Sequence, residues 1–135
     1  MTTQTLKPND YRNLAEFRAA LRRFLMFSEE AARAAGLSAQ QHQALLAIKG
    51  FAGDGLPSIG DLATQLCVRH HSAVGLVDRL EKTGYLRRDR DKTDRRRATL
   101  ALTASGEKLL SKLSAAHRRE LKLLKPSLEK VLEVV

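Results

Sequence analysis

The chain is poor in aromatic residues and in cysteine. It contains no tryptophan, two tyrosines, four phenylalanines and one cysteine. With so few rings it lacks the stacking platform on which proteins bind single-stranded nucleic acid. A lone cysteine, Cys67, excludes an internal disulfide framework and suits a reducing compartment.

Long apolar runs are also missing. No stretch approaches the roughly 18 apolar residues that a membrane-spanning helix needs. The opening residues, MTTQTLKPND, lack the apolar core of a secretory signal peptide. We therefore expect a cytoplasmic protein with no membrane partner.

Catalytic and metal-binding motifs are equally scarce. The sequence has no glycine-rich phosphate loop, no nucleophile elbow and no paired acids in a recognisable context. We therefore predict no enzymatic activity, no catalytic residues and no cofactor. The histidines are His42, His70, His71 and His117, and none has another histidine three or four residues away. No metal site is predicted, because zinc would need partners that only the fold could bring together.

Positive charge is what the chain has in excess. Its formal net charge is +9 and its pI is about 10.2. Basic clusters bind polyanions by releasing counterions, which favours double-stranded DNA as a partner, with acidic lipid as the alternative. At 135 residues the chain is expected to form one domain, residues 1–135, with a core of its own.

Hydrophobic periodicity predicts a mainly α fold with a small β wing, an α+β class. Ser38 with Gln41, and Ser58 with Asp61, are capping boxes, and Gly84 is placed to end a helix. The expected helices span residues 9–35, 38–49, 58–66, 70–83 and 103 onward, with a restart at Pro126, and the expected strands span 85–88 and 98–102. The positions expected to face the core are Leu45, Ile48, Ile59, Leu62, Ala63, Leu66, Ala73, Val77, Leu80, Leu100 and Leu102. Over residues 38–102 this order is that of a winged helix-turn-helix.

The helices at the two ends of the chain exceed what such a domain needs for its own core. Residues 9–36 and 103–135 carry apolar positions at helical spacing that would be buried best against another copy of the chain. The alternative is that they fold back on the same subunit. We favour a homodimer in which these are the dimerisation helices.

The run LVDRLEKTGYLRRDRDKTDRRRATLALTASGEKLL resembles the MarR family of bacterial regulators. The matching features, in order, are the long first helix, the second helix of the motif ending in LVDRLEKTGYL, the wing-tip DRR, the strand ending in LT, and a glycine three residues beyond. The resemblance implies homodimeric winged-helix proteins that bind roughly palindromic operators. It also implies that many members are repressors released by small phenolic or lipophilic effectors. The start RHHSAVG departs from the family's usual Ser- and Thr-rich start, so known operators are a poor guide.

The first turns of the helix at 70–83 are predicted to meet base edges. Val74 could contact a thymine methyl group, and Gly75 removes a side chain where the helix approaches the groove floor. The alternative is a solvated helix face with incidental histidines. The residues assigned to this DNA-binding face are Arg69, His70, His71, Ser72, Val74 and Gly75.

The hairpin between the two strands is dense in positive charge. Residues 87–97 hold seven cations and three aspartates, more charge than an ordinary hairpin tip carries. The predicted DNA contacts here are Arg87, Arg88, Arg90, Arg95, Arg96 and Arg97. By resemblance to the family, Asp94 braces Arg96, which enters the minor groove, and its neighbours contact phosphate. For each single arginine, a merely solvated charge is the alternative.

Cys67 has two interpretations. It could be a redox switch, or it could be a small buried hydrophobic residue. We favour burial, because no neighbouring pattern clearly lowers the pKa of its thiol.

Together these features predict a sequence-specific, DNA-binding transcription regulator. We expect a homodimeric repressor of a pseudo-palindromic operator, with half-sites about one helical turn apart, released by a small effector. One rival is a nonspecific architectural DNA-binding protein. The other is a ligand-binding or protein-interaction module on the same fold.

Overall fold

The computed structural model describes residues 5–90 and 98–133. The elements in these residues are α1 (Pro8–Ala34), α2 (Ala39–Lys49), α3 (Ile59–Leu66), α4 (His70–Lys82), β1 (Leu86–Arg90), β2 (Ala98–Leu102), α5 (Ala104–Leu121) and α6 (Lys125–Leu132). The strands pair antiparallel as one hairpin, with Leu86 opposite Leu102 and Arg90 opposite Ala98. The predicted fold, mainly helical with a two-stranded wing, is confirmed.

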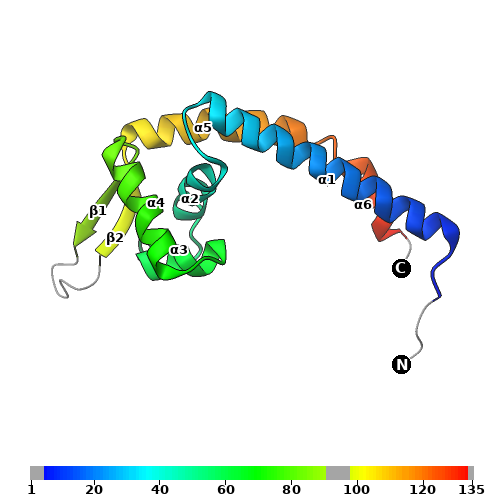
Figure 1. Cartoon of the computed structure of the whole chain (residues 1–135), viewed down its shortest axis with the longest axis horizontal. Coiled ribbons are helices and arrows are strands. Elements are labelled where there is room, and N and C mark those ends of the chain that lie inside the picture. The colour runs from blue at the N-terminus through cyan, green and yellow to red at the C-terminus, as the bar shows by residue number, and fades with distance from the viewer. Residues whose placement is uncertain (1–4, 91–97, 134–135) are drawn as a thin grey trace.

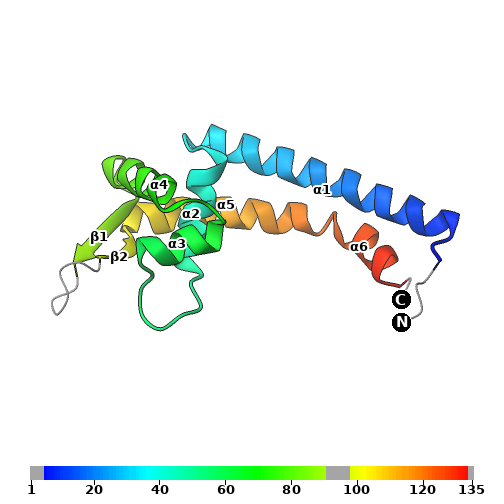
Figure 2. The same cartoon turned by 60° about the horizontal axis from the view of Figure 1, so that its bottom comes forward.

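The elements form a lobe and an arm. The lobe consists of α2, α3, α4 and the hairpin, which gather at one end of the molecule in Figures 1 and 2. The arm consists of α1, α5 and α6, and in it α1 runs beside α5 and α6 to the other end. Helix α1 contacts α6 and α5 along this arm, and contacts α2 where the arm meets the lobe. The N- and C-terminal helices therefore pack together, and the start of α1 and the end of α6 lie far from the strands of the wing.

Local capping sets the helix boundaries where the sequence predicted them. The Ser38 hydroxyl accepts a hydrogen bond from the Gln41 amide, and Ser58 does the same for Asp61. Thr103 caps α5 by accepting from the Gly106 amide. The strand β1 differs slightly from the prediction, since it covers 86–90 rather than 85–88. Pairing with β2 extends the ladder into a charged segment whose residues alone gave no strand signal.

The core lies inside the lobe. Its largest fully buried side chains come from different elements and include Leu45, Leu62, Leu80 and Leu100. The predicted inward positions are buried, except Ile59 and Leu66, which are half-buried against the same cluster. The periodicity of the sequence thus identified most of the residues that hold the lobe together.

The arm buries much less. No residue of α6 is buried, and α1 buries only Ala20, Ser28 and Ala32. The large apolar side chains that remain exposed on the arm are Tyr11, Leu14, Leu25, Met26, Leu121, Leu123, Leu128 and Leu132. A set of large exposed apolar side chains on one part of a protein is typical of an interaction site. Within the described residues, no helix is both long and apolar enough to cross a bilayer.

Candidate nucleic-acid interface and adjoining pocket

Helices α3 and α4 pack against each other across the turn at residues 67–69. One side of α4 is buried through Ala73, Leu76, Val77 and Leu80. The predicted contact residues lie away from that side: Arg69, His70, His71 and Ser72 are exposed, and Val74 and Gly75 are half-buried. The packing of α4 therefore presents the first turn of the helix to solvent, as DNA reading requires.

Gly75 is not required by the fold. A Cβ added to it would meet no atom within 4 Å, and its backbone is helical. Glycine in a helix interior destabilises the helix by about 1 kcal/mol relative to alanine. The space around Gly75 within the described chain therefore does not explain why glycine stands there, and its predicted place at the groove floor stays a prediction.

Cys67 ends α3 in the left-handed conformation, with φ of 55°. The Val68 amide bonds to the Ala63 carbonyl and the Cys67 amide to the Thr64 carbonyl, which is a Schellman motif. In this motif the left-handed residue points away from the helix, and Cys67 is exposed. The prediction that Cys67 is buried was therefore wrong, because the sequence did not show that the turn needed a left-handed residue there.

The arginines at the base of the wing are in three different situations. Arg87 is exposed and pairs with Asp89, with 3.0 Å between Nε and Oδ2. Arg90 is exposed and forms no ion pair within the part of the chain that the structure describes. Arg88 is engaged by two carboxylates of α4, at 2.5 Å from Asp78 and 2.8 Å from Glu81. Partial burial by itself lowers the pKa of Arg88, but the hydrogen bonds to Asp78 and Glu81 outweigh it and raise the pKa.

The wing tip lies outside the described residues. Asp94, Arg95, Arg96 and Arg97 all fall in the segment 91–97. The minor-groove role of Arg96 and its brace by Asp94 therefore remain predictions from sequence.

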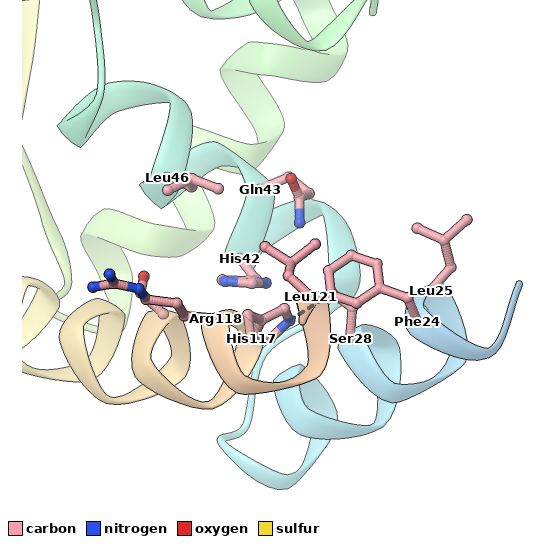
Figure 3. Close-up of a pocket in the computed structure, with 10 residues that line it drawn as sticks. Phe24, Leu25, Ser28, His42, Gln43, Leu46, His117, Arg118 and Leu121 are labelled. Carbon is pink, nitrogen blue, oxygen red and sulfur yellow. Dashed lines mark hydrogen bonds between the residues drawn. The ribbon is translucent and has the colours of Figure 1, made fainter. Parts of the chain in front are cut away.

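A pocket, whose lining residues the sequence could not assign, opens where the arm meets the lobe. Figure 3 shows the side chains that line it, which come from α1, α2 and α5. The volume of the pocket is about 390 Å³. Apolar side chains form much of its wall, and polar groups come from α1, α2 and α5. The lining residues are Phe24, Leu25, Ser28, His42, Gln43, Leu46, Ser114, His117, Arg118 and Leu121.

Two buried histidines stand side by side on the pocket wall. The ring centroids of His42 and His117 are 4.7 Å apart. The Nδ1–H of His117 donates to the Leu113 carbonyl at 2.7 Å, and Nε2 shares a hydrogen bond of 2.8 Å with the Ser28 hydroxyl. Both ring nitrogens of His117 therefore have a hydrogen-bond partner. In contrast, His42 is only 2% exposed and its Nδ1 has no hydrogen-bond partner.

Burial lowers the pKa of His42, and the neighbouring His117 lowers it further. A proton on His42 would place a charge on a buried ring whose Nδ1 has no acceptor among the described residues. His42 is therefore neutral near pH 7. Within residues 5–90 and 98–133, no group of three or more metal-ligating side chains gathers, whether around this pair or elsewhere.

A sequence signal for these histidines did exist. His42 precedes the buried Leu45 by three residues, and His117 follows the buried Leu113 by four. Each therefore lies on the apolar side of its helix. What the spacing could not show is that the two sides face each other.

Comparison with known proteins agrees with this architecture. A family model described as "MarR family" matches residues 35–97. FarR, an HTH-type transcriptional regulator of Neisseria gonorrhoeae, is 39% identical over 66 residues, covering 49% of this chain and 45% of FarR. YcgE, an uncharacterized HTH-type transcriptional regulator of Bacillus subtilis, is 30% identical over 120 residues, covering 88% of this chain and 76% of YcgE. The match to FarR thus spans about half the length of that relative.

Solved structures share the fold over most of the chain. A MepR mutant of S. aureus bound to an oligodeoxyribonucleotide superposes with a TM-score of 0.72 at 22% identity, covering 89% of this chain and 95% of MepR. NadR in complex with 4-hydroxyphenylacetate superposes with a TM-score of 0.68 at 27% identity, covering 99% and 92%. These structural relatives thus include one bound to DNA and one bound to a small aromatic acid. The wing, the exposed start of α4 and the fold shared with these structures agree with the sequence comparisons. The family model and the match to YcgE over most of both chains show that this chain belongs to the MarR family of winged helix-turn-helix, DNA-binding transcription regulators, which are not enzymes.

Proposed function

We propose that the protein is a homodimeric repressor that binds a pseudo-palindromic operator through α4 and the wing. The observation that carries the proposal is the pairing of two surfaces at opposite ends of the molecule. The lobe exposes the first turn of α4 beside an arginine-bearing hairpin, and the arm exposes apolar side chains. The first surface suits a DNA groove, and the second suits another copy of the chain.

Dimerisation would give the DNA contact its symmetry. Two copies joined through α1, α5 and α6 present two α4 helices related by a two-fold axis. Such a pair binds half-sites about one helical turn apart in successive major grooves. The operator is then expected to be an inverted repeat.

We further propose that the pocket binds a small effector that releases the DNA. Its volume of about 390 Å³ lies within the roughly 300–1,000 Å³ of ordinary ligand sites. Phe24, Leu46 and Leu121 suit a flat lipophilic or phenolic body, and Arg118 suits an acidic group at the rim. NadR, which holds 4-hydroxyphenylacetate, supports a ligand of this class.

The position of the pocket supplies the regulatory step. A ligand larger than the unliganded pocket would change the angle between the lobe and the arm. The distance between the two α4 helices of the dimer would change with that angle. Operator binding requires one fixed separation, so the ligand favours a state that binds DNA less well.

The test is selection of a binding sequence from a random duplex library, followed by titration against single-base variants of the selected site. Replacement of His71 and Ser72 by alanine should change the base preference, because these residues lie at the exposed start of α4. A specificity ratio near one for the parent would favour the architectural protein. Failure to bind any duplex would favour the ligand-binding module.

A further inference from the structure

We infer that Arg88 is a positioning residue, which joins the base of the wing to the recognition helix α4 instead of gripping a phosphate. The inference rests on the proposed DNA-binding role of α4 and the wing. It replaces the phosphate contact that the sequence suggested for Arg88. The structural juxtaposition that carries it is one guanidinium held by two carboxylates of the neighbouring helix.

The contacts use the forked shape of the guanidinium. Its Nη2 donates to Asp78 Oδ1 at 2.5 Å and to Glu81 Oε1 at 2.8 Å, and its Nε donates to the same Glu81 oxygen at 3.1 Å. Asp78 and Glu81 are three residues apart on α4, so they lie on the same side of the helix. Arg88 therefore joins β1 to α4 through both carboxylates at once.

The register of the hairpin explains why Arg88 and not another arginine takes this position. Along β1, Leu86 and Arg88 share one face of the hairpin, and Arg88 lies opposite the buried Leu100. This face turns toward the lobe, so the Arg88 side chain is only 27% exposed. Arg87, on the other face, has a side chain that is 58% exposed, and among the described residues its ion-pair partner is Asp89 of its own strand.

The negative charges of Asp78 and Glu81 would oppose DNA binding if no cation held them. Asp78 and Glu81 belong to the helix proposed to enter the groove, where phosphates would repel them. Arg88 neutralises part of that charge and holds the carboxylates toward the wing. The same contacts fix the direction in which the hairpin leaves α4, so the groove contacts of the wing depend on them.

Lysine could not replace this arrangement. An ammonium group would preserve the charge, but it puts one nitrogen on a flexible stem in place of the rigid plane that holds Nη2 and Nε. The second bond to Glu81, from Nε, is then lost, and the two carboxylates are held less firmly. A phosphate contact, in contrast, tolerates lysine well, because a phosphate accepts a point charge. Arg88→Lys therefore separates the two roles.

The experiment measures affinity for a fluorescein-labelled duplex, selected by the protein from a random library, at several salt concentrations. We expect Arg88→Gln and Arg88→Lys each to weaken binding about tenfold, with the salt slope unchanged. The matched control is Arg90→Gln, since Arg90 is exposed and forms no ion pair with any described residue. Arg90→Gln should reduce the salt slope by about one.

A double-mutant cycle completes the test. In the background Asp78→Asn with Glu81→Gln, the Arg88→Gln change should have little further effect on DNA affinity or on the free energy of unfolding. A slope that falls by about one in Arg88→Gln, with full retention of affinity in Arg88→Lys, would overturn the inference. The unfolding cycle needs no DNA, so absence of coupling there also overturns it. If the parent binds no duplex while the unfolding cycle shows coupling, the proposed function fails and the joint between β1 and α4 stands.

Discussion

The ring of His42 in α2 lies against the ring of His117 in α5, with centroids 4.7 Å apart, planes tilted by 50° and both side chains buried. The contact joins the lobe that carries the proposed DNA-binding surface to the arm that carries the exposed apolar side chains. It also forms part of the wall of the pocket. Any change that separates these rings therefore acts on the pocket and on the joint between lobe and arm together.

The stability of the protein should fall in mild acid because of His42. The pKa of His42 in the folded chain lies below the ordinary value of 6.5. Between the two pKa values the unfolded chain binds a proton at His42 and the folded chain does not, so a fall in pH favours unfolding. The stabilisation is complete above pH 6.5 and is lost as the pH falls from there toward the lowered pKa. Urea unfolding across this range should show a shallower pH dependence for His42→Gln. His71→Gln, which changes an exposed residue of α4, is the control and should follow the parent. Parallel curves for the parent and His42→Gln would show that His42 titrates equally in both states.

Gly106→Ala should destabilise the fold by about 1–3 kcal/mol. A Cβ at this position would overlap the carbonyl of Tyr85, against which the start of α5 is packed. Thr103 fixes that approach by donating to the Gly84 carbonyl at 2.5 Å. Urea midpoints measure the loss. The control is Gly75→Ala, where a Cβ meets nothing within 4 Å and stability should rise by up to about 1 kcal/mol. An unchanged midpoint for Gly106→Ala would mean that α5 can move away from Tyr85 at little cost.

The arm should determine the oligomeric state. Leu123 and Leu132 are 69% and 60% exposed, so a subunit alone gains little from them. Sedimentation at micromolar concentration should give the parent twice the mass of the 15.0 kDa chain, and Leu123→Glu with Leu132→Glu should shift it toward monomer. Leu56→Glu, in the lobe's loop before α3, should remain dimeric. A monomeric parent would remove the basis for the two half-site operator.

Arg118 should select acidic ligands. It lines the pocket and is the only cation among the residues found there. Calorimetry with 4-hydroxyphenylacetate and with its neutral methyl ester separates charge from shape. We expect Arg118→Ala to weaken binding of the acid about tenfold and to leave the ester unaffected. Arg119→Ala, which changes the next residue of α5 outside the pocket, is the matched control. Equal losses for acid and ester would assign Arg118 a packing role.

Much of the fold followed from local chemistry. The capping serines, the helix-ending glycines and the apolar spacing predicted nearly every element, because each acts over a few residues. The same spacing identified the exposed start of α4, since Ala73, Val77 and Leu80 had to face inward. The positive charge and the motifs around the wing indicated the family.

Longer-range relationships came only from the tertiary structure. The apolar sides of α2 and α5 each showed a histidine, but only the packing of the two helices brought His42 against His117 and formed the pocket. Likewise, charge in the sequence marked Arg88 as a DNA contact, whereas the hairpin register turned it toward Asp78 and Glu81. The sequence predicted that Cys67 is buried, whereas its left-handed backbone conformation leaves it exposed to solvent. Sequence determined what each element is, because capping and periodicity are local. Tertiary structure decided which side chains meet, because that depends on how faces distant in the chain are brought together.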